Sequence, residues 1–261
     1  MDIVRDRLWI WGHEAGSHDR SWNTPAPSRM TPAEGAFYLG TPNLIMVRYD
    51  DKPEPPYVQY AWSFRPLKQF VWSIVGAAGV TSEDEIEQTL LLAKTFPNMT
   101  GVMMDDFFRA EPDAGGALTP ERLAEIRKRL VVGDKRLDLW VVLYQYQLDF
   151  PIRDHLDQWD VITYWTWQAP DLWRLEQDFA RLEELTPGKR KILGCYMWDY
   201  GNSRPIGTGV MRHQCELALH WLKGGRIEGI IFLASCICDL DIEAVEWTRD
   251  WIAKVGDRPI G

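Results

Sequence analysis

Two adjacent aspartates end an otherwise apolar run in the segment Gly101-Val102-Met103-Met104-Asp105-Asp106. A carboxyl group beside a pocket can act as an acid, a base or a nucleophile, according to its protonation state. Because side chains alternate between the two faces of a strand, neighbouring aspartates cannot both point to one face without a bulge. The pattern predicts that one aspartate faces a pocket while the other accepts backbone hydrogen bonds. The alternative is that both cap a turn.

Acid–base chemistry can use a second carboxyl group, so that one acts as the acid and the other as a base or nucleophile. The partner of Asp105 could be Asp106, Asp199 in the segment 195–200, or Glu14 in the polar segment 13–29. Asp199 is the preferred partner, although it could equally pair with Arg204 or cap the turn at 201–203. Glu14 could also be a solvated loop residue.

Aromatic residues are unusually frequent, with 14 Trp, 9 Tyr and 9 Phe. Flat side chains pack against the C–H faces of sugar rings, and sugar hydroxyls need hydrogen-bond donors and acceptors. The candidate substrate-binding residues lie near the expected strand ends: His13, Trp72, Gln145, Tyr164, Trp165, Trp167, Tyr196 and Trp198. A single tryptophan is more often a core residue, so the prediction depends on the clustering.

Eight apolar runs are expected to form the strands that position these residues: Leu8–His13, Leu44–Tyr49, Phe70–Gly76, Gly101–Phe107, Leu139–Tyr146, Val161–Trp167, Ile192–Asp199 and Gly229–Cys236. Each is followed by an amphipathic run. Several of these begin with helix-start signals, such as Thr31-Pro32, Ser82-Glu83 and Thr119-Pro120. Eight β-α units predict an α/β protein, a (β/α)8 TIM barrel that forms a single domain over residues 1–261. An open doubly wound sheet is less favoured, because segment 12–18 lacks a glycine-rich phosphate turn.

The G-x-x-x-D pattern of Gly101 and Asp105 resembles the end of the fourth strand in several TIM-barrel glycoside hydrolases. The segment 162–165 is similar to the sixth strand of chitinase-type (family 18) barrels, but Phe107 stands where their fourth strand has its catalytic glutamate. The acidic pair also resembles that of small spherulin-4-like and polygalactosaminidase barrels. The resemblance implies that Asp105 is a nucleophile or another catalytic-site carboxylate. Cleavage of a glycosidic bond needs two carboxyl groups beside the bond, so the candidates for the acid/base are Asp106, Asp199 and Glu14.

Composition argues against other classes of partner. The chain has 29 basic and 38 acidic residues, a net charge of −9, so neither nucleic acid nor an anionic membrane surface is an expected partner. No apolar run reaches the ~20 residues of a membrane span, and the first residues lack the layout of a secretion signal. The expected location is cytoplasmic as written, or periplasmic or secreted if a signal peptide has been removed. The four cysteines are expected to be reduced thiols.

The sequence therefore favours a carbohydrate-active enzyme, a glycoside hydrolase that acts on an oligosaccharide or glycoside without a cofactor or metal. Two alternatives stay open. One is a non-catalytic carbohydrate-binding barrel, because the expected fifth and sixth strands end without an acid. The other is a metal-dependent sugar-processing enzyme that would use His13, Glu14, Asp105 and Asp106. The oligomeric state stays open as well.

Overall fold

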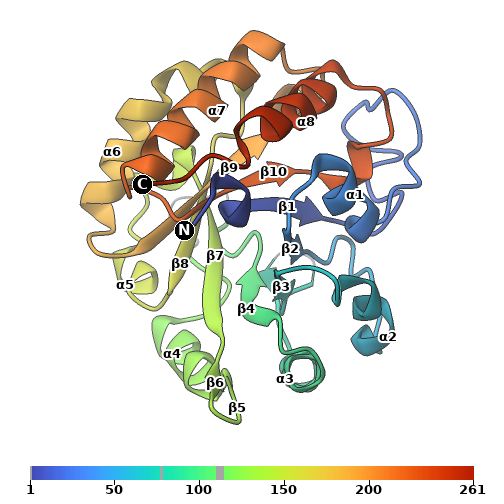
Figure 1. The fold of residues 1–261 in the computed structure, drawn as a ribbon. Helices are drawn as coiled ribbons and strands as arrows, with labels where there is room; N and C mark the ends of the chain where they lie inside the picture. Colours follow the sequence, from blue (N-terminus) through green and yellow to red (C-terminus); the bar gives the residue numbers. More distant parts are fainter. Residues whose placement is uncertain (1, 77–78, 110–114) are drawn as a thin grey trace.

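The computed structural model describes residues 2–76, 79–109 and 115–261, and in them eight parallel strands close into a barrel (Figure 1). The strand order is β1-β10-β9-β8-β7-β4-β3-β2, and β1 closes the barrel by pairing with both β2 and β10. The strands are β1 (Leu8–Gly12), β2 (Asn43–Met46), β3 (Gln69–Ser73), β4 (Met99–Met104), β7 (Asp138–Tyr144), β8 (Val161–Trp165), β9 (Arg190–Tyr196) and β10 (Gly229–Leu233). The predicted (β/α)8 TIM barrel is confirmed.

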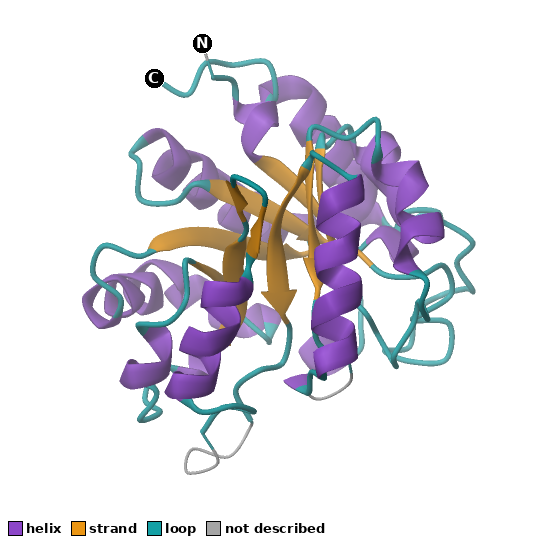
Figure 2. Cartoon of the chain, turned by 90° about the horizontal axis from the view of Figure 1, so that it is seen from below, coloured by secondary structure: helices purple, strands orange, loops and turns teal. Residues whose placement is uncertain are grey.

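Helices surround the barrel on the outside (Figure 2). They are α1 (Pro32–Leu39), α2 (Tyr57–Ala61), α3 (Glu83–Thr95), α4 (Pro120–Arg129), α5 (Arg153–Leu156), α6 (Leu175–Leu185), α7 (Thr208–Lys223) and α8 (Glu243–Val255). A short antiparallel hairpin of β5 (Val131–Val132) and β6 (Lys135–Arg136), which the sequence did not predict, lies between α4 and β7. None of the helices in the described ranges is long and apolar enough to cross a membrane.

The helix starts follow from local capping. The Thr31 side chain accepts a hydrogen bond from the Glu34 amide, and the Glu34 carboxylate accepts one from the Thr31 amide at 2.9 Å. Such a capping box satisfies backbone donors that a helix N-terminus leaves unpaired. Ser82 caps α3 in the same way, and Thr119 caps α4. The second helix, α2, is short: it ends at Ala61, and only a 3₁₀ turn at Trp62–Phe64 follows before Pro66, which an α-helix interior does not accommodate.

Tryptophan side chains fill the interior of the barrel. The ring centroids of Trp9 on β1 and Trp140 on β7 lie 5.2 Å apart, and those of Trp11 on β1 and Trp165 on β8 lie 5.1 Å apart. Neither pair comes from neighbouring strands, so the rings meet across the barrel axis. Glycines make room for them: a Cβ added at Gly194 on β9 would lie 2.1 Å from the Trp165 ring. Part of the tryptophan excess is therefore explained by the barrel core.

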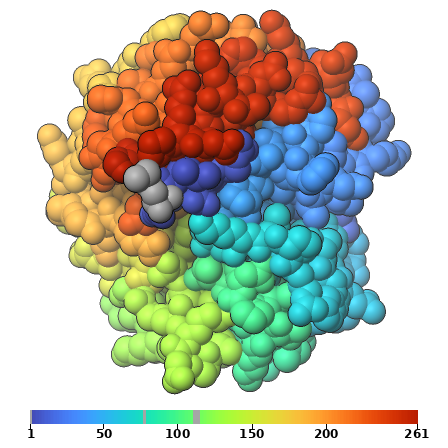
Figure 3. Space-filling view, viewed as in Figure 1, coloured from blue at the N-terminus to red at the C-terminus, as the bar shows by residue number. Residues whose placement is uncertain are grey.

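The two chain ends lie side by side at the N-terminal end of the barrel. The Val4 amide donates to the Arg258 carbonyl at 2.9 Å, and the Arg5 amide donates to the Gly256 carbonyl at 2.7 Å. Figure 3 shows the corresponding N-terminal and C-terminal surfaces in contact. The opposite end of the barrel is where the strands end and where the long loop of segment 13–29 begins. A functional site is therefore expected at that end.

Candidate active site

A cavity of about 600 Å³ opens at the C-terminal ends of the strands, and we call it the aromatic pocket. Side chains from β1, β7, β8, β9 and β10 line it, together with residues of the loops that follow the strands. Its lining residues are Trp11, His13, His18, Trp22, Tyr49, Val80, Asp105, Asp106, Phe108, Arg109, Val142, Tyr144, Tyr146, Trp165, Trp167, Tyr196, Tyr200 and Leu233. TIM-barrel enzymes carry their active sites at this end of the barrel.

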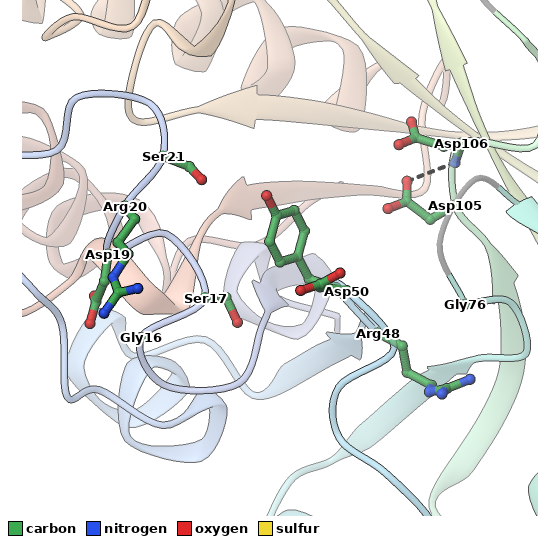
Figure 4. A pocket seen from close by; sticks show the side chains of 11 residues that line it. Gly16, Ser17, Asp19, Arg20, Ser21, Arg48, Asp50, Gly76, Asp105 and Asp106 are labelled. Carbon is green, nitrogen blue, oxygen red and sulfur yellow. Dashed lines mark hydrogen bonds between the residues drawn. The ribbon is translucent and has the colours of Figure 1, made fainter.

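Both aspartates after β4 line the aromatic pocket, which differs from the prediction that only one would face it. The strand ends at Met104, and Asp106 adopts a left-handed backbone conformation with φ of 47°. Asp tolerates this conformation better than most residues, and the turn breaks the alternation of the strand. The Asp106 amide donates to Asp105 Oδ1 at 3.0 Å (Figure 4), so Asp105 also accepts the backbone hydrogen bond that was expected of one member of the pair.

The protein environment raises the pKa of both carboxyl groups. For Asp105, burial raises the pKa well above its usual range and the neighbouring Asp106 adds to the effect, against the hydrogen bond from the Asp106 amide. Asp106 presents its carboxyl to the cavity, where the walls still displace much of the bulk water, and this raises its pKa. The Tyr144 hydroxyl donates to Asp106 Oδ1 at 3.0 Å and lowers the pKa of Asp106. Of the pair, Asp105 therefore holds a proton more readily.

Two buried histidines, His13 and His18, stand with their ring centroids 5.0 Å apart in the wall of the pocket. His13 Nε2 accepts a hydrogen bond from Trp11 Nε1 at 3.1 Å, which fixes the orientation of the His13 ring. Burial, and then the nearby His18, lower the pKa of His13 well below its usual range. Burial lowers the pKa of His18 to about 4. Both rings are therefore neutral near pH 7 and can offer the substrate hydrogen bonds or an apolar face.

The low pKa of His18 predicts a loss of stability in acid. In the unfolded chain this histidine titrates near ~6.5, so between about pH 6.5 and 4 the unfolded state binds more protons than the folded state. Stability present above pH 6.5 is lost as the pH falls, by up to about 3 kcal/mol for this group. The melting temperature of His18→Gln should fall less steeply than that of wild type over this interval. The exposed His220→Gln on α7 is the control, and a wild-type slope in His18→Gln would contradict the prediction.

The aromatic residues of the pocket form a continuous wall. Trp165 packs on Trp11 and on Tyr196, whose ring centroid lies 5.0 Å from its own. Trp167 stands at the rim, where its ring contacts Tyr196 at 5.9 Å and Tyr144 at 5.8 Å. The predicted residues His13, Trp165, Trp167 and Tyr196 are thus brought together around Asp105 and Asp106.

The structure places Trp72 and Tyr164, two other predicted substrate-binding residues, outside the barrel. Trp72 is fully buried against Tyr57 of α2, with ring centroids 5.1 Å apart. Tyr164 is fully buried against Phe179 of α6, with ring centroids 5.8 Å apart. Tyr164 is next to the inward-facing Trp165, so strand alternation turns it to the helices. Their assignment to the sugar site is therefore corrected to core packing.

Trp198 and Gln145 support the wall from behind and do not line it. Trp198 is buried, and its Nε1 donates to the carbonyl of Trp22 at 2.9 Å, which holds the loop between β1 and α1. Gln145 follows Tyr144 and faces the other way. Its Oε1 accepts from the Trp167 amide at 2.9 Å, and its Nε2 donates to Asp171 at 3.3 Å. Neither residue, both predicted to bind substrate, lines the aromatic pocket, and both hold loop segments that carry its aromatic side chains.

Asp199, the preferred partner of Asp105, is occupied by structural contacts and lies outside the pocket. Its carboxylate accepts hydrogen bonds from Asn202 at 3.0 Å, from Arg204 at 3.1 Å and from the Ala169 amide at 3.2 Å. This is the alternative in which it pairs with Arg204 and caps a turn. The partly buried Glu14 is not among the lining residues. Asp106 is therefore the second carboxyl group beside Asp105.

Phe107, which stands where chitinase-type barrels have their glutamate, is fully buried, and its ring centroid lies 4.9 Å from that of Trp159. This position therefore faces the protein core. Among the described residues, no group of three or more His, Cys, Asp or Glu lies close enough to hold a metal ion, so the four suggested ligands do not form a cluster.

A second cavity, of about 620 Å³, adjoins the aromatic pocket, and we call it the polar pocket (Figure 4). It shares Tyr49, Asp105 and Asp106 with the aromatic pocket. Its other lining residues are Gly16, Ser17, Asp19, Arg20, Ser21, Arg48, Asp50 and Gly76. The carboxyl pair thus lies where the two cavities meet.

Sequence reasoning missed several residues of the site, including Trp11, His18, Trp22, Tyr49 and Tyr144. A signal was present for two of them. Trp11 and Tyr144 fall within predicted strands, and each lies an even number of positions from another inward-facing residue, Trp9 and Trp140 respectively. His18 and Trp22 lie in a loop, where no periodicity indicates direction, and Tyr49 ends the predicted strand Leu44–Tyr49 but lies in the loop after β2, which ends at Met46.

Comparisons with known proteins bear on the fold. No family model matches the chain, and no curated protein matches it in sequence. A candidate α-L-fucosidase from Bacteroides thetaiotaomicron superposes with a TM-score of 0.64 at 12% identity, over 99% of this chain and 98% of that one. This chain and that enzyme share the same barrel fold. At such low identity the similarity shows the fold alone.

Two further structures share the barrel. The glycoside hydrolase domain of PgaB (BpsB) from Bordetella bronchiseptica has a TM-score of 0.54 at 9% identity, over 97% of this chain and 99% of that one. A xylanase and α-amylase inhibitor protein, in complex with trehalose, has a TM-score of 0.59 at 10% identity, over 96% and 98%. Barrels of this kind therefore include both enzymes and an inhibitor.

Proposed function

We propose that the protein is a glycoside hydrolase in which Asp105 and Asp106 act on a sugar held in the aromatic pocket. The proposal rests on one observation: two carboxyl groups of unequal environment lie together at the mouth of the barrel, within an aromatic wall. The pKa of Asp105 is raised well above its usual range, whereas the hydrogen bond from Tyr144 limits the rise for Asp106, and this difference suits the acid and the anionic roles that glycoside cleavage requires.

The environments of the two carboxyl groups suggest their roles. Asp105, whose pKa is raised further, is the proton donor to the glycosidic oxygen. The bond between that oxygen and the anomeric carbon breaks with its electron pair on the oxygen. Asp106, which accepts from Tyr144, stabilises the positive charge that develops on the sugar. Water then adds to the anomeric carbon and returns a proton to Asp105. This assignment reverses the nucleophile role that family resemblance implies for Asp105.

A carbohydrate-binding barrel without catalysis is the second candidate. It is favoured by the fact that Asp199 and Glu14 do not line the pocket, so both carboxyl groups come from one turn. The aromatic wall would bind a sugar equally well in either case. The two candidates differ in whether product is released.

The test is product release from a panel of 4-nitrophenyl glycosides and natural oligosaccharides. Wild type should release a sugar that the double variant Asp105→Asn/Asp106→Asn does not. Calorimetric titration of both proteins with the same sugars measures binding separately. Binding without product in wild type would favour the binding barrel, and equal turnover in wild type and the double variant would refute both carboxyl assignments.

Tyr144→Phe should change the pH profile of the reaction. The Tyr144 hydroxyl stabilises the ionised form of Asp106, so its removal raises the pKa of Asp106 further. The acidic limb of kcat/KM should therefore move to higher pH, and the rate should fall by about 10- to 100-fold, as for loss of a hydrogen bond to a charged group. Tyr146→Phe is the control, because the Tyr146 ring stacks on Tyr144 at 5.4 Å, whereas within the described residues the tyrosine that donates to Asp106 is Tyr144; the acidic limb should stay in place in this control. An unmoved acidic limb in Tyr144→Phe would contradict the role given to Asp106.

A further inference from the structure

The polar pocket differs in chemistry from the aromatic pocket, although the two meet at Asp105 and Asp106. The segment that carries Arg20 and Ser21 lies across the cavity from the carboxyl pair (Figure 4). A molecule that extends through both cavities must pass the two carboxyl groups. A sugar in the aromatic pocket that presents its anomeric carbon to the carboxyl pair would place the group bonded to that carbon in the polar pocket.

Several polar side chains of this cavity are already engaged by the protein. Arg48 forms an ion pair with Glu85 and donates to the carbonyls of Asp51 and Pro53 at 3.0 and 3.3 Å. Asp19 accepts from the Ser28 amide at 2.7 Å and pairs with Arg29 at 3.2 Å. These groups build the wall of the cavity.

Three side chains of the lining, the exposed Arg20 and Asp50 and the partly buried Ser21, have no hydrogen-bond or ion-pair partner among the described residues and are open to a ligand that displaces water from them. Arg20 can only donate hydrogen bonds, the Asp50 carboxylate can only accept them, and Ser21 can do both. A sugar hydroxyl also donates and accepts, so it can use all three. The charges of Arg20 and Asp50 are opposite, and therefore the cavity offers no net charge from these groups to an ionic ligand.

We propose that the polar pocket binds the leaving group of the reaction, and that this group is a second, uncharged sugar residue held by Arg20, Ser21 and Asp50. An apolar aglycone would displace water from Arg20, Ser21 and Asp50 without replacing its hydrogen bonds, and an anionic residue would meet the carboxylates of Asp50 and Asp106. The substrate is therefore a neutral disaccharide or longer oligosaccharide. This inference rests on the proposed hydrolase function.

The experiment compares two kinds of substrate in variants of the polar pocket. The probes are the 4-nitrophenyl glycosides of glucose, galactose, mannose, fucose and N-acetylglucosamine, and disaccharides in which each of these sugars is linked to glucose. Arg20→Ala and Asp50→Ala should lower kcat/KM on the disaccharide by about 10- to 100-fold, as expected when a hydrogen bond to a charged group is lost. The nitrophenyl glycoside, which has no hydroxyls in its leaving group, should be affected far less.

Matched controls are available elsewhere on the chain. Arg212→Ala removes an exposed arginine of α7 that lines neither pocket. Asp241→Ala removes an exposed aspartate with the same left-handed φ of 51° as Asp50, and so reproduces any backbone effect. Both should act like wild type on both substrates. Melting temperatures close to that of wild type in the pocket variants would exclude a merely structural role.

The outcomes separate this inference from the hydrolase proposal. If both substrates are hydrolysed in a way that depends on the carboxyl pair, but the pocket variants reduce both rates equally, the leaving-group assignment is refuted and the hydrolase stands. Faster cleavage when the leaving glucose is replaced by glucuronic acid would refute the neutral-sugar assignment.

If nothing is hydrolysed, calorimetric titration tests the second-sugar site. The disaccharide should then bind more tightly than the methyl glycoside of its first sugar, and this difference should be lost in Arg20→Ala and Asp50→Ala. Equal binding of the two ligands would refute it.

Discussion

Asp105→Asn is expected to lower the turnover number by about 100- to 10,000-fold, the range over which a positioned acid or base contributes. The amide keeps the shape of the carboxyl group and can still accept from the Asp106 backbone, but it has no acidic proton for the glycosidic oxygen. The loss should be largest on substrates with a poor leaving group, such as a sugar, and smallest on 4-nitrophenyl glycosides, whose leaving group needs little protonation. Asp106→Asn should affect both kinds of substrate alike, because charge stabilisation is needed in either case.

The same substitution should stabilise the fold near neutral pH. Burial raises the pKa of Asp105 in the folded state above its unfolded value of ~3.9. Between these two values the folded state binds more protons than the unfolded state, so wild-type stability is fully present at low pH and is lost as the pH rises through the folded pKa. The neutral amide escapes this loss. The melting temperature of the variant should exceed that of wild type by about 2–4 °C at pH 7, which corresponds to ~1 kcal/mol, and the difference should vanish near pH 4.

Activity and melting temperature measured on one preparation test both expectations. Asp134→Asn, in the exposed turn between β5 and β6, is the matched control and should change neither quantity. A variant that loses activity and also stability would indicate that Asp105 is a structural carboxylate. Full activity would remove it from the reaction.

The fold could be predicted from the sequence because each strand is a short apolar run and several helices carry their own start signals. The capping residues Thr31, Ser82 and Thr119 begin helices where the pattern indicated. The second and fifth helices, α2 and α5, are only five and four residues long and are the hardest to predict from the sequence. Helices this short are held by tertiary packing, which leaves little local signal.

The site was predicted less completely, and the errors have a physical pattern. Tyr164 and Gln145 each lie one position from a true pocket residue, Trp165 and Tyr144. A strand turns its side chains outward and inward in alternation, so an error of one position moves a residue from the pocket to the surrounding helices. Residue type and closeness to a strand end were therefore insufficient without the direction of each side chain.

The adjacent aspartates show where the alternation rule itself stops. The rule places Asp105 and Asp106 on opposite faces, yet the positive φ of Asp106 brings both to the pocket. The loop residues His18 and Tyr49 lie beyond the rule altogether, because their direction is set by contacts with Tyr200 and with His13. These contacts join distant parts of the chain and leave no periodic signal in a single sequence.

Gly194→Ala should produce the largest loss of stability of the substitutions considered. A Cβ at this position of β9 would lie 2.1–2.4 Å from three atoms of the Trp165 ring, where no real Cβ fits. Trp165 cannot easily withdraw, because its ring also packs on Trp11 and Tyr196 and its Nε1 donates to Thr163 at 2.9 Å. Overpacking of a core commonly costs about 1–3 kcal/mol, and we expect at least the upper end here, or failure to fold. Denaturant unfolding measures the change.

A second substitution keeps this prediction testable if Gly194→Ala does not fold. Trp165→Leu removes the ring that the new methyl group would meet, so Gly194→Ala/Trp165→Leu should be more stable than Gly194→Ala, although Trp165→Leu alone is destabilising because it leaves a cavity. Gly209→Ala in α7 is the matched control, because a Cβ there meets nothing within 4 Å and alanine favours a helix. A double variant no better than Gly194→Ala would show that the glycine serves the backbone of β9 and not the tryptophan. Rescue would instead indicate that Gly194 on β9 makes the space in which Trp165 packs within the aromatic wall.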